Sequence, residues 1–301
     1  MLNNPEIGIS ILNPVDIDPD FLDKMVDECI RRQIKHIQID GPMHHRVHAN
    51  IDGSINFRKY AQYNQEKDQQ YIKKLEIGLP PGLRKAIEHG VEIFFWHHEV
   101  EIPDQFINDF PDILNSNGDV EASSPILEDF IRNKINDFFS VFPDFTGLVI
   151  TLHETVVPLL KLPNQKLSKT KRIEHICRII LSESAKFNKK VIFRPFASLP
   201  EDCQAMSDAF NAIGNELEIM TKWTQFDWNL HLPPNREAAR LGNHPMWLEG
   251  DINGEYFGQG RIPCVLRKYL KKRMKYFADV PFPIKGVVVR TDRNHNTLFG
   301  G

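Results

Sequence analysis

The sequence predicts an α/β protein built as a closed (β/α)8 barrel. Two observations lead to this prediction. Eight short runs rich in Val, Ile and Phe recur along the 301 residues, and a longer stretch with helical periodicity separates most of them from the next. Buried strands that alternate with helices are typical of a parallel sheet, and eight such strands close a barrel. Because one barrel core needs about 250 residues, we expect residues 1–301 to form a single domain.

The predicted strands are the segments that are both short and more apolar than their surroundings. In chain order they span residues 6–12, 36–40, 91–96, 147–152, 190–196, 217–223, 246–251 and 286–291. Each has the length of an ordinary β-strand.

Local signals mark several of the intervening helices. Ser124 followed by Pro125 offers an N-cap and a first helical residue, and apolar residues then recur three and four apart over 126–142. Gly90 is placed as the C-cap of the helix before the third strand. The Lys/Arg run over 267–275 is interpreted as the solvated face of an amphipathic helix. After the eighth strand the sequence offers no covering helix, so either the barrel closes by other means or, as we prefer, the native polypeptide is longer.

Composition excludes several classes of protein. With 41% hydrophobic and 26% charged residues, the chain has the make-up of a folded globular protein. A net charge of −3 predicts no nucleic-acid partner. The sequence has no long apolar stretch and no signal peptide at its start, so we expect a soluble protein of the cytoplasm or periplasm without a membrane partner. Its four scattered cysteines predict neither disulfides nor a zinc site.

Charged and aromatic residues gather where the predicted strands end. In a parallel barrel these ends share one face, so the side chains that follow them line a common cleft. The residues at these ends are His97, His98, His153, Glu154, Arg194, Lys222, Trp223, Asp227, Trp228, Glu249, Asp251, Glu255, Arg290, Asp292 and Arg293. A charged cleft with indole walls suits carbohydrate.

Three carboxylates are candidate catalytic groups. A glycosidase needs one protonated carboxyl for the leaving oxygen and a second carboxylate that activates water or attacks directly. Glu154, Asp227 and Glu255 follow the fourth, sixth and seventh strands and supply three candidates. For Asp227 and Glu255, the structural alternative is that they form ion pairs with Arg194 and Lys222 that hold the barrel mouth together.

Around these residues the sequence resembles the family 67 α-glucuronidases, whose catalytic domain is a TIM barrel. Lys222 to Asp227 is similar to the family's K-x4-D segment, and the Glu255-Tyr256-Phe257-Gly258-Gln259 stretch is similar to its E-Y-x-G-Q segment. Asp227 and Glu255 lie 28 positions apart, as the family's two general-base carboxylates do. The resemblance covers about residues 145–260, and the first half of the chain matches by topology alone.

This resemblance implies roles for individual residues. It implies that Glu154 is the general acid, that Asp227 and Glu255 are the general base, and that Arg194 and Lys222 bind the uronate carboxylate. The chain departs from the family at Ile150, where the family has a second carboxylate-binding lysine. It also lacks the family's separate N-terminal and C-terminal domains.

Together these observations predict an inverting hydrolase of an α-linked terminal sugar, in particular a uronic acid on an oligosaccharide. Inversion predicts that acid and base carboxyls lie about 6.5–9.5 Å apart. No cofactor and no metal are expected, and the oligomeric state is left open. The predicted substrate-binding residues are His97, His98, Arg194, Lys222, Trp223, Trp228, Glu249 and Arg290.

Two alternatives remain from other classes. The first is a non-catalytic barrel that binds carbohydrate. The second is a metal-dependent sugar isomerase or hydrolase, in which His44, His45 and His48 converge with His97 and His98 on zinc. The end of the first strand lacks the His-x-His that metal-dependent barrel hydrolases usually carry there, which favours the glycosidase.

Overall fold

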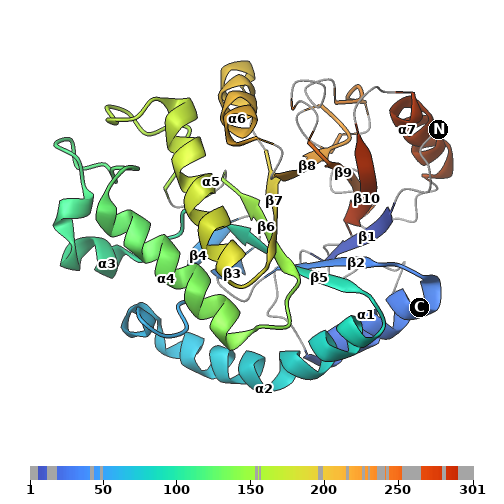
Figure 1. The fold of residues 1–301 in the computed structure, drawn as a ribbon, viewed down its shortest axis with the longest axis horizontal. Helices are drawn as coiled ribbons and strands as arrows, with labels where there is room; N and C mark the ends of the chain where they lie inside the picture. Colours follow the sequence, from blue (N-terminus) through green and yellow to red (C-terminus); the bar gives the residue numbers. More distant parts are fainter. Residues whose placement is uncertain are drawn as a thin grey trace.

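The computed structural model describes most of the chain. The described residues are 6–11, 19–40, 44–47, 50–152, 155, 157–195, 199–214, 217–225, 228–229, 231–235, 241, 244–252, 266–279 and 283–290. Eight parallel strands close a barrel at the centre, and helices surround it (Figure 1). The (β/α)8 barrel predicted from the sequence is therefore confirmed.

Every predicted strand overlaps one strand of the barrel. The barrel strands are β1 (Glu6–Ile11), β2 (His36–Asp40), β5 (Glu92–His98), β6 (Gly147–Thr151), β7 (Lys190–Arg194), β8 (Glu218–Lys222), β9 (Met246–Asp251) and β10 (Ile284–Arg290). Around the barrel they run in chain order, and β1 closes the ring by pairing with both β2 and β10. The C-terminal ends of all eight strands therefore share one face.

The helices follow the signals in the sequence. They are α1 (Pro19–Arg32), α2 (Glu66–Glu88), α3 (Asp104–Asp109), α4 (Pro125–Val141), α5 (Lys169–Lys186), α6 (Pro200–Ile213) and α7 (Arg267–Ala278), with 3-10 turns η1 (Ala61–Tyr63) and η2 (Pro111–Ile113). The Ser124 side chain caps α4 by accepting from the Ile126 N–H, and Gly90 takes a φ of 67° after α2. The sequence did not indicate the antiparallel hairpin of β3 (His44–Val47) and β4 (Asn50–Ser54).

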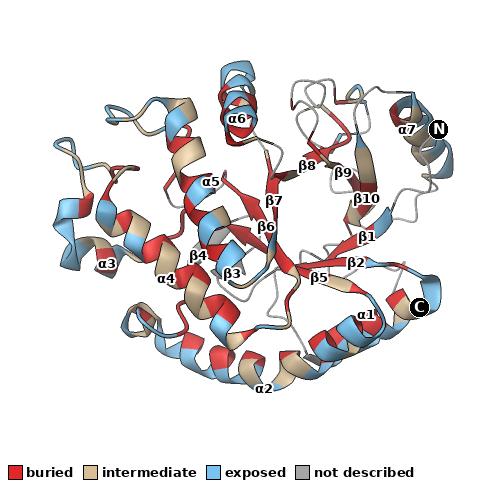
Figure 2. Cartoon of the chain, viewed as in Figure 1, coloured by how far each residue is buried: buried red, intermediate tan, exposed pale blue. Residues whose placement is uncertain are grey.

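Alternation along the strands produces two separate cores. One set of side chains fills the barrel interior, and the other packs between strands and helices. Figure 2 shows that the strands of the barrel are largely buried. The interior set is Phe94, Trp96, Val149, Ile192, Met220, Trp247 and Val288. His36 packs below it against the rings of Phe94 and Trp247, with ring centroids 4.6 and 4.3 Å away. The interior is a filled core, which leaves the strand ends for function.

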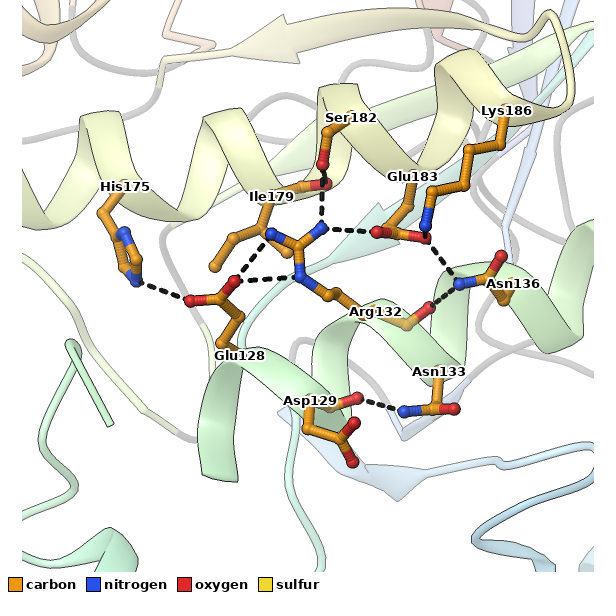
Figure 3. Close-up of polar contacts among 10 residues, drawn as sticks. All are labelled: Glu128, Asp129, Arg132, Asn133, Asn136, His175, Ile179, Ser182, Glu183 and Lys186. Atoms are coloured by element: carbon orange, nitrogen blue, oxygen red, sulfur yellow. Dashed lines mark hydrogen bonds and ion pairs between the residues drawn. The ribbon is translucent and has the colours of Figure 1, made fainter. Parts of the chain in front are cut away.

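A polar network joins α4 to α5 on the outer wall of the barrel (Figure 3). The Glu183 side chain of α5 is fully buried and accepts hydrogen bonds from Arg132, Asn136 and Lys186. Arg132 also donates to Ser182 and Glu128. Burial favours the neutral acid, but these donors outweigh it, so the pKa of Glu183 lies below its ordinary value.

Replacing this carboxylate tests the helix contact. Glu183→Ala leaves the donors of Arg132 and Asn136 without their shared acceptor, and we expect a loss of about 1–3 kcal/mol in the free energy of unfolding. Glu174→Ala is the matched control, because Glu174 pairs with Lys171 and Arg178 of its own helix only at the surface. Urea unfolding of both variants measures the difference, and equal losses would contradict this role for Glu183.

The same pair of variants predicts a pH dependence. Because the pKa of Glu183 is lowered in the folded protein, its stabilisation is complete above the ordinary carboxyl value of 4.5 and decreases as the pH falls below it. The stability difference between wild type and Glu183→Ala should therefore shrink in acid, as measured by urea unfolding between pH 7 and pH 3.

Candidate functional site

Interior residues near the ends of β7, β8, β9 and β10 form a charged layer at the C-terminal end of the barrel. The period of two that places Ile192, Met220, Trp247 and Val288 inside also places Arg194, Lys222, Glu249 and Arg290 inside, two residues further along each strand. All four are buried, with exposed fractions of 5%, 5%, 0% and 6%. We call these four residues the charged layer.

Glu249 lies between the two arginines of this layer. Arg194 Nε donates to Glu249 Oε2 at 2.6 Å, and Arg290 Nε lies 3.9 Å from Glu249 Oε1. Within the part of the chain that the structure describes, Glu249 Oε1 accepts no hydrogen bond although it is buried. The carboxylate of Glu249 on β9 thus pairs with guanidinium groups from β7 and β10, two strands that do not follow one another in the sequence.

Two indoles support the cations. Lys222 Nζ lies 4.6 Å and Arg290 Cζ 5.1 Å from the ring centre of Trp228, and Arg194 Cζ lies 5.3 Å from that of Trp96. A cation over an aromatic face is stabilised by the ring quadrupole without losing its charge. Trp228 is thus buried between two cations, and its contacts link Lys222 to the rest of the layer.

Further polar residues lie beside the layer. His98 points to the interior like Trp96, whose ring it meets edge-on at 4.6 Å. Asp251 is the ladder partner of Arg290 and is also buried. The described side chains at this end of the barrel thus include three buried cations, Arg194, Lys222 and Arg290, which are groups that can bind an anion.

Trp223, predicted to bind substrate, faces away from the layer. It directly follows Lys222, and successive side chains of an extended chain point to opposite faces. Its indole is 1% exposed, packs edge-on against Tyr269 of α7, and occupies the space that a side chain at Gly250 would need. The structure therefore places Trp223 in the packing between barrel and helices.

His97 also lies on the helix-facing side, opposite His98. Its ring stacks on Phe95, and its Nε2 lies 2.9 Å from Glu99 Oε2. Since an ionised carboxylate only accepts, Nε2 carries the proton of this bond. Lys134 of α4 donates to the other oxygen of Glu99 at 2.8 Å. His97 thus belongs to a buried cluster behind the barrel wall.

Sequence reasoning missed Glu99 and Lys134 of this cluster. Burial raises the pKa of Glu99, but the charge of Lys134 and the contact with His97 outweigh burial and lower the pKa to about 2. A signal was present, because Lys134 lies in the apolar stripe of α4 with Phe130, Ile131 and Phe138. A lysine at such a position is rarely buried without a partner.

The three predicted catalytic carboxylates, Glu154, Asp227 and Glu255, lie outside the described residues. So do His48 and the side chains of His44 and His45, which the zinc alternative invoked. In the segments that the structure does describe, no group of three or more His, Cys, Asp or Glu residues is arranged to hold a metal ion. In those segments no helix is long and apolar enough to cross a membrane.

Comparison with known proteins identifies the fold of this chain but assigns it to no family. No protein-family model and no curated protein sequence matches the chain. Solved structures do. A GH138 enzyme targeting pectin rhamnogalacturonan II superposes with a TM-score of 0.60 and 13% identity over 97% of this chain and 35% of that one. Dispersin B gives a TM-score of 0.56 and 10% identity over 97% and 92% of the two chains.

A third structure is the β-hexosaminidase of Streptomyces plicatus, with a TM-score of 0.58 and 11% identity over 96% of this chain and 59% of that one. This chain thus spans about a third of the GH138 enzyme's length and under two thirds of the Streptomyces enzyme's length. None of the three is a family 67 α-glucuronidase, so that resemblance stays a prediction. At these identities the comparisons establish that the chain has the barrel fold of these glycoside hydrolases.

Proposed function

We propose that this protein is a glycoside hydrolase that removes an α-linked terminal uronic acid from an oligosaccharide, with inversion at the anomeric carbon. The observation that carries the proposal is the charged layer, in which Arg194, Lys222 and Arg290 converge around Glu249 at the functional end of a barrel. The glycoside hydrolases among the structural neighbours support the reaction class.

The charged layer fits a sugar that carries a carboxylate. Arg194 and Lys222 bind that carboxylate in the proposal, and Arg290 adds to the positive potential. Because all three are at most 6% exposed, their attraction for an anion is less screened by water than that of surface cations. The bond to Glu249 fixes the guanidinium of Arg194, which lowers the entropy lost when an anion binds.

The other residues predicted to bind substrate fall into two groups, according to the face of the barrel wall on which each lies. His98, Glu249 and Trp228 are on or beside the layer, and we assign them to sugar hydroxyls or to the orientation of the cations. Trp223 and His97 are buried on the helix-facing side, and the proposal gives them no contact with substrate.

The proposed reaction uses the carboxylates that follow the strand ends. Glu154 protonates the leaving glycosidic oxygen, while Asp227 and Glu255 deprotonate a water molecule on the opposite face of the ring. The water oxygen forms the new bond to the anomeric carbon, and the aglycone leaves as an alcohol. Room for this water requires acid and base carboxyls about 6.5–9.5 Å apart.

Neutralising the acid tests the enzyme class. Glu154→Gln keeps the shape of the side chain but cannot donate the proton, so the rate of sugar release from uronic-acid-decorated oligosaccharides should fall by about 10²–10⁴-fold. Glu88→Gln, at the exposed C-terminal end of α2, is the control and should retain the wild-type rate. Chromatographic assay of released sugar measures both. Binding of the oligosaccharide without release, by wild type and both variants alike, would favour a non-catalytic carbohydrate-binding barrel.

Removing one cation tests the substrate class. Lys222→Met preserves much of the volume beside Trp228 but deletes a charge of the layer. We expect kcat/KM for a uronate substrate to fall by about 10–100-fold, the loss of one charge-assisted contact, while kcat/KM for the matching neutral glycoside changes little. Equal losses on both substrates would mean that Lys222 does not bind the substrate carboxylate.

A further inference from the structure

The segments that follow β5 and β6 are joined by backbone hydrogen bonds. The N–H of Glu99 donates to the carbonyl of Thr151 at 2.9 Å, and the N–H of Val157 donates to the carbonyl of Val100 at 3.2 Å. These bonds lie on either side of residues 152–156. Two consecutive residues, Glu99 and Val100, therefore hold both ends of the segment in which Glu154 occurs.

A second set of bonds joins the same two connections further from the barrel. The Gln165 amide accepts from the N–H of Ala122 at 2.8 Å and donates to the carbonyl of Val120 at 3.0 Å. Glu121 Oε2 accepts from the N–H of Lys166 at 3.3 Å. Hydrogen bonds thus join the β5–α4 connection to the β6–α5 connection both next to the strands and next to the helices that follow, so the two connections form one unit.

Lys134 fixes this unit to the helix layer. Its Nζ donates to Glu99 Oε1 at 2.8 Å and to the carbonyl of Glu101 at 3.0 Å, and it lies 5.2 Å from the ring centre of Phe130. The other oxygen of Glu99 is held by His97. The side chains of Lys134 and Glu99 are fully buried. The turn at residues 99–101 is thereby tied to both β5 and α4.

Stability alone does not explain this arrangement. A buried ion pair loses its hydration, and replacement by apolar groups of similar volume is often neutral or stabilising. A rigid support beneath a reacting group gives a different benefit, because displacing that group by about 1 Å can reduce the rate about 10²-fold. The Lys134–Glu99 pair is linked through residues 99 and 100 to Thr151 and Val157, the described residues on either side of the segment in which the proposed acid occurs.

We propose that Lys134 is a positioning residue. Through Glu99 and the turn at residues 99–101, it fixes the ends of the segment between Thr151 and Val157 and so the place of Glu154 relative to the charged layer. The inference rests on the proposed function for the role of Glu154. The mechanical part, that Lys134 and Glu99 hold this segment, concerns described residues only and can be tested without a substrate.

The test compares two double variants of α4 contacts. Glu99→Gln/Lys134→Met removes the pair without leaving a buried charge alone, and Gln can still accept from His97. Arg132→Met/Glu183→Gln is the matched control, since it removes an ion pair from the same helix but on the side that faces α5. Circular dichroism first verifies that both fold, and the single variant Lys134→Met, in which Glu99 keeps His97 as its partner, replaces the first if it does not.

Hydrogen exchange tests the mechanical part. We expect the amides of Glu99 and Val157 to exchange about tenfold faster or more in Glu99→Gln/Lys134→Met than in wild type, while exchange of the Ile150 amide within β6 is unchanged. The control should leave the amides of Glu99 and Val157 as they are in wild type. Unchanged exchange in the first variant, or equal acceleration in both, would overturn the proposal.

Kinetics test the positioning part. On a uronate oligosaccharide, Glu99→Gln/Lys134→Met should lose about 10–100-fold in kcat with KM nearly unchanged, because the acid is displaced while the charged layer is intact. Faster exchange with an unaltered kcat would overturn the positioning role. If wild type releases no sugar at all, the proposed function fails, and the exchange rates still decide whether Lys134 holds the segment.

Discussion

The structure depends on one geometric constraint, which is that side chains alternate between the two faces of each barrel strand. In a closed barrel one face meets the packed interior and the other meets the helices, so each residue is committed to one of two environments. On β7, β8, β9 and β10 the interior positions Ile192, Met220, Trp247 and Val288 are apolar, and the next interior positions lie two residues further along. There the same face presents Arg194, Lys222, Glu249 and Arg290, and the hydrophobic core passes directly into the charged layer.

A second constraint governs how these charges are buried. A buried charge is tolerated only with partners, and the two clusters in front of and behind the barrel wall satisfy this by placing a carboxylate between two basic side chains. Glu249 lies between Arg194 and Arg290 in front of the barrel wall, and Glu99 lies between Lys134 and His97 behind it. The first cluster includes buried guanidinium groups at the C-terminal end of the barrel, and these can bind an anionic ligand. The second cluster is covered by helix α4, and this suits a role in supporting the segment that follows β6.

The fold could be predicted from the sequence because strand, helix and length signals all agreed. The membership of the charged layer was also largely predictable, since Arg194, Lys222, Glu249 and Arg290 each follow an apolar run. The face on which a residue lies was harder to predict. His97 and Trp223 were chosen because they occur near strand ends, but β5 extends to His98, and the strict alternation turns both residues towards the helices. Glu99 and Lys134 meet only in three dimensions, so no local pattern joined them.

The central claim is that the C-terminal end of this barrel binds a sugar through its carboxylate. Isothermal titration of the wild-type protein with glucuronate and with glucose at low ionic strength tests it most directly, because the two ligands differ only in that group. The account predicts that glucuronate binds at least about tenfold more tightly and that the difference diminishes as salt is added. Equal affinity for the two sugars, or a preference for glucose, would contradict it.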